Sequence, residues 1–164
     1  MADKIFLRCL GNVPGPRFLC GLTQGDHSVV LAEKLGDFGT VWSRHISKSG
    51  MSWRLECLGP PPPGVDPGKL FLFGSNSAAV IITPRTPGFD RTQSWHVEEV
   101  PGGVTLENRA LRDAGIERRF LDGRTDAADV VLSPNTDPPF TGTHWEIHLA
   151  DLKDDQGLTP VPEE

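Results

Sequence analysis

Phe-Leu-Phe-Gly at residues 71–74, Val-Ile-Ile at residues 80–82 and Trp95 form a pattern that occurs three times in this chain of 164 residues. The other copies run from residues 18–21 to Trp42 and from residues 120–123 to Trp145. The leading phenylalanine and the tryptophan are 24, 24 and 25 residues apart, and successive tryptophans are 53 and 50 residues apart. Repetition of this length predicts a fold built from three similar units.

Each unit contains four short stretches rich in Val, Ile, Phe and Trp and bounded by Gly, Pro, Asn or Asp, which is the pattern of β-strands. The predicted strands are residues 4–10, 17–21, 28–33 and 41–47; 52–58, 69–74, 79–83 and 94–100; and 104–109, 119–123, 129–133 and 144–150. Apolar residues alternate along the first strand of each unit, so Leu7, Leu55 and Leu106 are expected on one face. Only residues 111–118 are predicted to form a helical turn.

Twelve strands in three four-stranded units resemble the β-trefoil. A β-propeller is the other fold built from four-stranded units, but it needs at least four of them. The resemblance implies six strands that close a barrel and six that form three hairpins over it, with Trp42, Trp95 and Trp145 near the barrel axis. We expect an all-β, β-trefoil domain with pseudo-repeats at about residues 1–49, 50–101 and 102–151. Residues 152–164 are predicted to form an acidic tail.

Composition and charge narrow the choice of partners. A net charge of −6 and a pI near 5.3, with scattered Lys and Arg, argue against a nucleic-acid-binding surface or a basic membrane patch. The chain has no apolar run of membrane-spanning length and no signal peptide at its start, so a cytoplasmic monomer is expected. The three cysteines are then expected to be reduced, buried residues rather than to form a Cys9–Cys20 disulfide.

Catalytic and metal-binding patterns are not found in the sequence. It has no glycine-rich phosphate loop, no nucleophile elbow and no metal-spaced cysteine cluster, so we expect no enzyme, cofactor or metal site. His144 and His148 would lie about 13 Å apart on a strand, too far to share a metal ion, and are expected to face solvent. Proteins that resemble the β-trefoil are mostly binding scaffolds.

A lectin is one interpretation. Gln93-Ser94-Trp95 matches the Gln-x-Trp signature of ricin-B-like lectins, and the other units have Thr at the Gln position. The resemblance implies that Gln and Trp are structural and that sugar is bound by an Asp, an aromatic platform and an Asn. Asp122 matches the Asp, but the platform positions are Ala32, Thr83 and Ser133. The sugar-binding candidates are therefore Asp122, Asn135 and Phe140.

Phe38, Phe89 and Phe140 precede the three tryptophans in turn-rich loops. Exposed rings could stack on sugars, but recurrence in all three units favours buried positions in the cap.

A protease inhibitor is the second interpretation. The chain resembles the fungal β-trefoil protease inhibitors, the mycocypins and their serine-protease-inhibiting relatives. The resemblance rests on the missing signal peptide, residues 69–74, and the Val-x-Leu-x-Pro of residues 130–134 followed by Trp145-Glu146-Ile147. It implies a rigid scaffold that inserts a surface loop into a protease cleft.

The candidate anchors for such a loop are Arg and Asn residues near prolines. Arg85 and Thr86 lie between Pro84 and Pro87, and Asn135 follows Pro134; Arg91 and Arg112 are second choices. We therefore expect a non-enzymatic protein that inhibits a serine or cysteine protease, with carbohydrate binding as the alternative.

Overall fold

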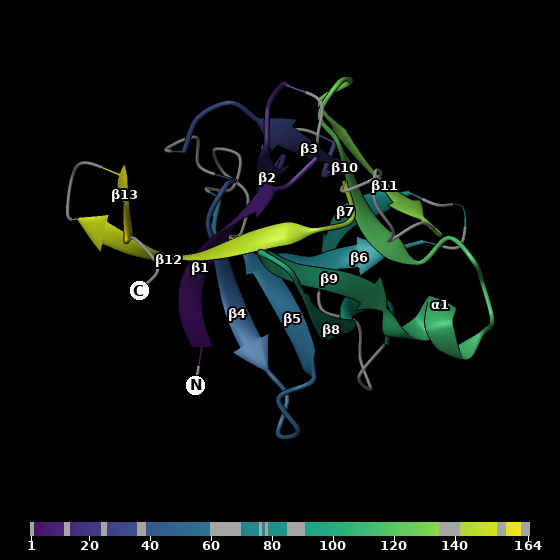
Figure 1. The fold of residues 1–164 in the computed structure, drawn as a ribbon. Helices are drawn as coiled ribbons and strands as arrows, with labels where there is room; N and C mark the ends of the chain where they lie inside the picture. The colour runs from purple at the N-terminus through teal and green to yellow at the C-terminus, as the bar shows by residue number, and fades with distance from the viewer. Residues whose placement is uncertain are drawn as a thin grey trace.

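The protein was analysed as a computed structural model that describes residues 2–11, 14–23, 26–35, 39–59, 70–75, 77, 79–84, 91–134, 142–153 and 157–161; for residues 2, 151–153 and 157–161 only the backbone is described. These residues form an all-β structure (Figure 1). Its strands are β1 (Ala2–Cys9), β2 (Phe18–Gly21), β3 (Val29–Ala32), β4 (Trp42–Ile46), β5 (Ser52–Cys57), β6 (Leu70–Gly74), β7 (Val80–Pro84), β8 (Trp95–Val100), β9 (Gly103–Asn108), β10 (Phe120–Arg124), β11 (Asp129–Ser133), β12 (Trp145–Lys153) and β13 (Gly157–Val161). A 3-10 turn, η1 (Arg91–Gln93), and a short helix, α1 (Arg109–Asp113), interrupt them.

Six of the strands form a closed ring. Strand β1 pairs with β4, β4 with β5, β5 with β8, β8 with β9, β9 with β12, and β12 again with β1, all antiparallel. Every strand of the ring therefore has two neighbours, and the ring has no unpaired edge.

The remaining strands of the three units form hairpins that repeat the same register. Strands β2 and β3, β6 and β7, and β10 and β11 pair with each other. Each hairpin joins the ring at its leading phenylalanine; the pairs are Arg8 with Phe18, Glu56 with Phe71, and Glu107 with Phe120. The hairpins also contact one another through the pairs Val30 with Asp129, Ser28 with Ile81, and Ala79 with Val131.

The core lies inside this ring and beneath the hairpins. Trp42, Trp95 and Trp145 are completely buried, which confirms the prediction from the repeats. Each indole N–H donates to a backbone carbonyl 23 or 24 residues earlier: Leu19 at 3.0 Å, Leu72 at 3.1 Å and Leu121 at 3.0 Å. The hydrogen bonds satisfy the polar end of each buried indole and fix the hairpin to the ring within each unit.

The structure confirms most of the predicted strands and corrects three details. All twelve are present, with ends within two residues of the predicted ones except that β12 continues to Lys153, and Leu7, Leu55 and Leu106 share the buried face. The predicted tail also contains the end of β12 and a thirteenth strand, β13, which pairs with β12 from Leu149 to Lys153. The end of β12 and β13 extend away from the rest of the ring in Figure 1.

The helical turn starts two residues earlier than predicted, because Asn108 caps it, and it ends at Asp113 rather than at residue 118. The Asn108 side chain accepts a hydrogen bond from the backbone N–H of Leu111 at 3.2 Å and so caps the first turn of α1. Within the described part of the chain, no helix has the length and apolar character needed to cross a membrane.

The prediction that His144 and His148 face solvent is wrong. His144 precedes β12 and is only 8% exposed. His148 lies beside Phe6 of the neighbouring strand β1; its imidazole stacks on the Phe6 ring with ring centres 4.8 Å apart and contacts Glu146 at 2.5 Å. Phe6 thus covers one face of His148, and a single-strand pattern does not reveal the partner strand.

Candidate functional site

The candidate anchors fall into two groups. Arg85, Thr86, Asn135 and Phe140, together with Phe38 and Phe89, lie outside the described residues. Arg91 and Arg112 are described, are exposed, and lie on η1 and α1 rather than in open loops. Arg91 forms an ion pair with Asp113, and the Arg112 side chain lies 3.6 Å from a Glu107 carboxylate oxygen.

A buried glutamine joins the two ends of segment 85–90. Gln93 is 2% exposed, and its side-chain amide donates to the hydroxyl of Thr83 at 2.6 Å and to the carbonyl of Pro84 at 2.8 Å. The carbonyl of Thr83 lies 3.4 Å from the same nitrogen. Since Pro84 ends β7 and Gln93 ends η1, these bonds fix the chain on both sides of the segment that carries Arg85.

A hydrogen bond from Asn108 also fixes the chain that follows segment 85–90. The side-chain amide of Asn108 donates to the carbonyl of Thr92 at 2.8 Å while its oxygen caps α1. The backbone N–H of Arg109 donates to the carbonyl of Ser94 at 3.0 Å. The turn after segment 85–90 is therefore attached to β9 and α1, which are parts of the ring unit that follows.

The matching place in the third unit lacks this arrangement. Thr143 replaces the glutamine, and its buried hydroxyl finds no hydrogen-bond partner within the part of the chain that the structure describes. Cys9 occupies the position of Asn108 relative to the third hairpin. Among the residues that the structure describes, a side chain links the two flanks of segment 85–90, and none is seen to do so for residues 135–141.

The sugar-binding position proposed from the lectin signature is partly covered. Asp122 is half-buried on β10, next to Ser133 at a platform position, which hydrogen-bonds its carboxylate. Burial raises the pKa of Asp122, and the Ser133 hydroxyl opposes this shift. The structure confirms that Gln93 of the Gln-x-Trp signature is buried and that Trp95 belongs to the core.

The cysteines are buried and free, as predicted. Burial raises the pKa of Cys9 and of Cys57 from 9.0 to about 11, so both are neutral thiols at neutral pH. Within the described residues, no three His, Cys, Asp or Glu side chains are grouped so that they could bind a metal ion.

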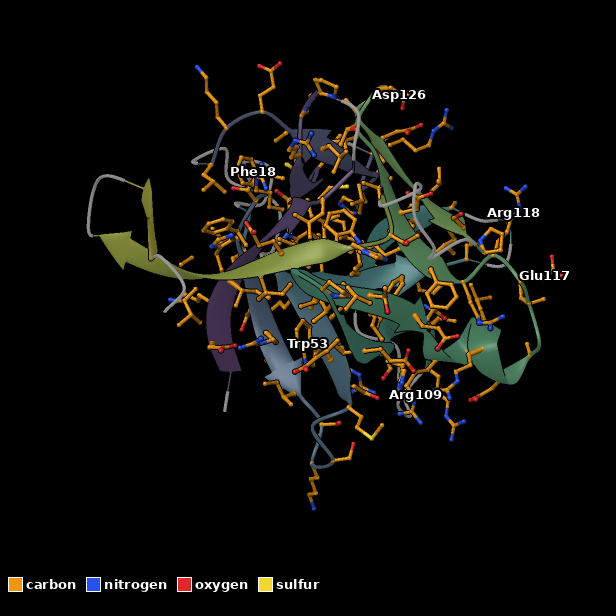
Figure 2. All side chains as sticks on the ribbon, in the orientation of Figure 1. Phe18, Trp53, Arg109, Glu117, Arg118 and Asp126 are labelled. Atoms are coloured by element: carbon orange, nitrogen blue, oxygen red, sulfur yellow. The ribbon has the colours of Figure 1, made fainter. Side chains whose placement is uncertain are left out.

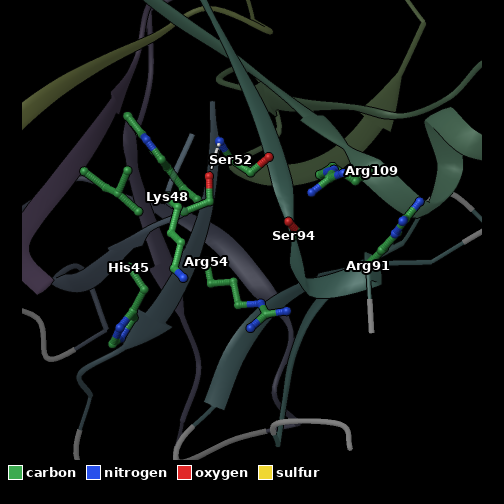
Figure 3. A pocket seen from close by; sticks show the side chains of 10 residues that line it. His45, Lys48, Ser52, Arg54, Arg91, Ser94 and Arg109 are labelled. Atoms are coloured by element: carbon green, nitrogen blue, oxygen red, sulfur yellow. Dashed lines mark hydrogen bonds between the residues drawn. The ribbon is translucent and has the colours of Figure 1, made fainter. Parts of the chain in front are cut away.

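The sequence did not predict a pocket of about 510 Å³ beside the ring (Figure 3). The end of β4, the following turn, the start of β5, η1 and the first residue of α1 line it. Its basic side chains are His45, Lys48, Arg54, Arg91 and Arg109. They come from positions up to 64 residues apart, so only the pairing of β5 with β8 brings them together.

A comparison of the chain with models of known protein families found no match, and a comparison with curated proteins found none.

Proposed function

We propose that the protein is a β-trefoil that inhibits a protease through segment 85–90. The closed ring of six strands and the three hairpins in equivalent register support the β-trefoil arrangement. The hydrogen bonds from Gln93 to Thr83 and Pro84 are the observation that carries the inhibitor proposal.

The strength of loop binding to a protease depends on the conformational entropy that the loop loses. A loop that is ordered only when it enters a protease cleft loses conformational entropy on binding, which weakens the complex. Gln93 joins the two flanks of a six-residue segment on a closed barrel, so the flanks are already fixed before a protease binds. Arg85 is the first residue beyond Pro84 and is the proposed anchor for a protease that cleaves after basic residues.

The test is titration of trypsin, papain and legumain with the pure protein, alongside a glycan array. We expect inhibition of trypsin, and we expect Arg85→Ala to raise the inhibition constant about 30-fold or more, the effect of losing a central binding residue. Arg118→Ala is the matched control, because Arg118 is an exposed arginine that lies away from Trp53 and Arg109 in Figure 2.

Several outcomes separate the proposal from its alternatives. Inhibition of legumain that Asn135→Ala abolishes would move the anchor to the third unit. Glycan binding without inhibition of any of the three proteases would contradict the inhibitor proposal and favour a lectin, with Asp122→Asn as the variant to examine next. Equal effects of Arg85→Ala and Arg118→Ala would show that positive charge alone drives the contact.

A further inference from the structure

The pocket beside β4 and β5 concentrates positive charge on an acidic protein. It contains four of the chain's 16 Lys and Arg residues, Lys48, Arg54, Arg91 and Arg109, together with His45. No Asp or Glu is among the described residues that line it. A cluster of like charges in a concave site opposes folding through mutual repulsion, and a bound anion relieves that repulsion.

Two cations of the pocket are available to a ligand. Arg91 has Asp113 as an ion-pair partner, and His45 contacts Glu56 at 3.1 Å. Lys48 and Arg109, in contrast, make no side-chain hydrogen bond or ion pair with any residue that the structure describes. Arg109 is half-buried, and no carboxylate of the described residues pairs with its guanidinium.

The cations lie on opposite walls of the pocket. Figure 3 shows Lys48 and His45 on one side, Arg91 and Arg109 on the other, and the guanidinium of Arg54 between them. Ser52 and Ser94 add hydroxyl groups to the lining. A pocket of about 510 Å³ is large enough for a small molecule with several charged groups, and guanidinium groups bind tetrahedral oxyanions through paired hydrogen bonds.

We propose that this pocket binds a small polyanion that carries several phosphate or sulfate groups. Opposed cationic walls favour a ligand with at least two anionic groups over a single carboxylate or one inorganic phosphate. Arg91 lines the pocket and directly follows the proposed inhibitory segment in the sequence.

The experiment measures binding by calorimetry with inositol hexakisphosphate for the phosphate class and sucrose octasulfate for the sulfate class. Neutral inositol and sucrose are the uncharged controls. We expect one of the polyanions to bind, and affinity to fall as salt rises from about 50 to about 300 mM because added ions screen the attraction. Arg109→Gln and Lys48→Gln are each expected to weaken binding about tenfold or more.

The controls separate a built site from general attraction. Arg118→Gln and Lys34→Gln remove exposed positive charges outside the pocket and should change the dissociation constant less than twofold. If neither polyanion binds, or if these controls weaken binding as much as Arg109→Gln, the proposal is wrong. Lys48 is exposed on a turn, so Lys48→Gln gives a folded test protein even if Arg109→Gln lowers the melting temperature.

A final measurement keeps this inference distinct from the inhibitor proposal. Lys48→Gln should leave trypsin inhibition unchanged while weakening polyanion binding. Loss of inhibition in Arg85→Ala with intact polyanion binding would support both proposals independently.

Discussion

A methyl group added at Gly123 would lie 2.7 Å from the sulfur of Cys9, although 114 residues separate the two in sequence. The same contact recurs around the ring. A Cβ at Gly21 would lie 2.9 Å from the Cys57 sulfur, and one at Gly74 would lie 2.6 Å from the amide nitrogen of Asn108. Each unit thus receives a side chain of the following unit against its glycine, and the third unit closes on the first.

Gly123→Ala should destabilise the protein, because a real Cβ cannot approach a sulfur atom this closely. We expect the free energy of unfolding to fall by about 1–3 kcal/mol, the usual cost of overpacking. Urea denaturation checks this value. The double variant with Cys9→Ala should recover part of the loss, since the smaller side chain leaves room for the methyl group; strictly additive losses would mean that the contact is not the cause.

Trp95→Phe should lower the free energy of unfolding by at least about 2 kcal/mol, because it leaves the buried Leu72 carbonyl without its donor and leaves a cavity. Thermal and urea denaturation measure the change. Trp53→Phe is the matched control, since the Trp53 indole N–H makes no hydrogen bond within the described part of the chain. A loss from Trp53→Phe as large as that from Trp95→Phe would show that the hydrogen bond to Leu72 contributes little.

The buried thiols should make the protein sensitive to alkaline pH. The pKa of Cys9 and of Cys57 is raised to about 11 in the folded state, so the folded protein keeps these protons when the unfolded chain has lost them. The contribution of the two thiols to stability should therefore be constant below about pH 8 and fall as pH rises from about 9 toward 11. Denaturation midpoints across this range measure the effect, and Cys57→Ser, which cannot ionise there, should show a shallower fall.

Asp122 should destabilise the folded protein at neutral pH. Because burial raises its pKa, the folded state holds the proton more tightly than the unfolded chain, and stability decreases as pH rises through the interval between the two pKa values. Asp122→Asn should then be more stable than the wild type at pH 7 and equal to it near pH 3. A wild type that is the more stable protein at pH 7 would mean that the Ser133 hydrogen bond outweighs burial.

The sequence repeats predicted the strands and the core residues well because each unit must pack in the same way. Leu7, Leu55 and Leu106 occupy equivalent places in the first strand of each unit, where apolar residues alternate with period two along one buried face. Strand β13 was not predicted because the first and second units have no strand that corresponds to it. Lys48 and Arg109 could not be recognised as neighbours, since 61 residues separate them and only strand pairing brings them to one pocket.

The role of Gln93 shows why a site is harder to predict than a fold. The signature Gln93-Ser94-Trp95 indicates a structural glutamine. Its acceptors on Thr83 and Pro84 belong to strand β7, which the signature does not include. Thr40 and Thr143 stand at the matching positions of the other two units, so the glutamine that makes this link occurs only in the second unit. The difference between units, rather than the repeat, therefore distinguishes segment 85–90.

The decisive test of inhibition through segment 85–90 is the rate at which trypsin cleaves after Arg85. Mass spectrometry measures this rate for the wild type and for Gln93→Ala. We predict that the wild type inhibits trypsin and is cleaved slowly at this bond. Gln93→Ala loses the hydrogen bonds to Thr83 and Pro84, so we expect it to be cleaved quickly and to inhibit about tenfold less. Thr143→Ala is the control and should behave as the wild type. Rapid cleavage of the wild type without inhibition, or inhibition by Gln93→Ala as strong as that by the wild type, would contradict the proposal that segment 85–90 is the inhibitory loop.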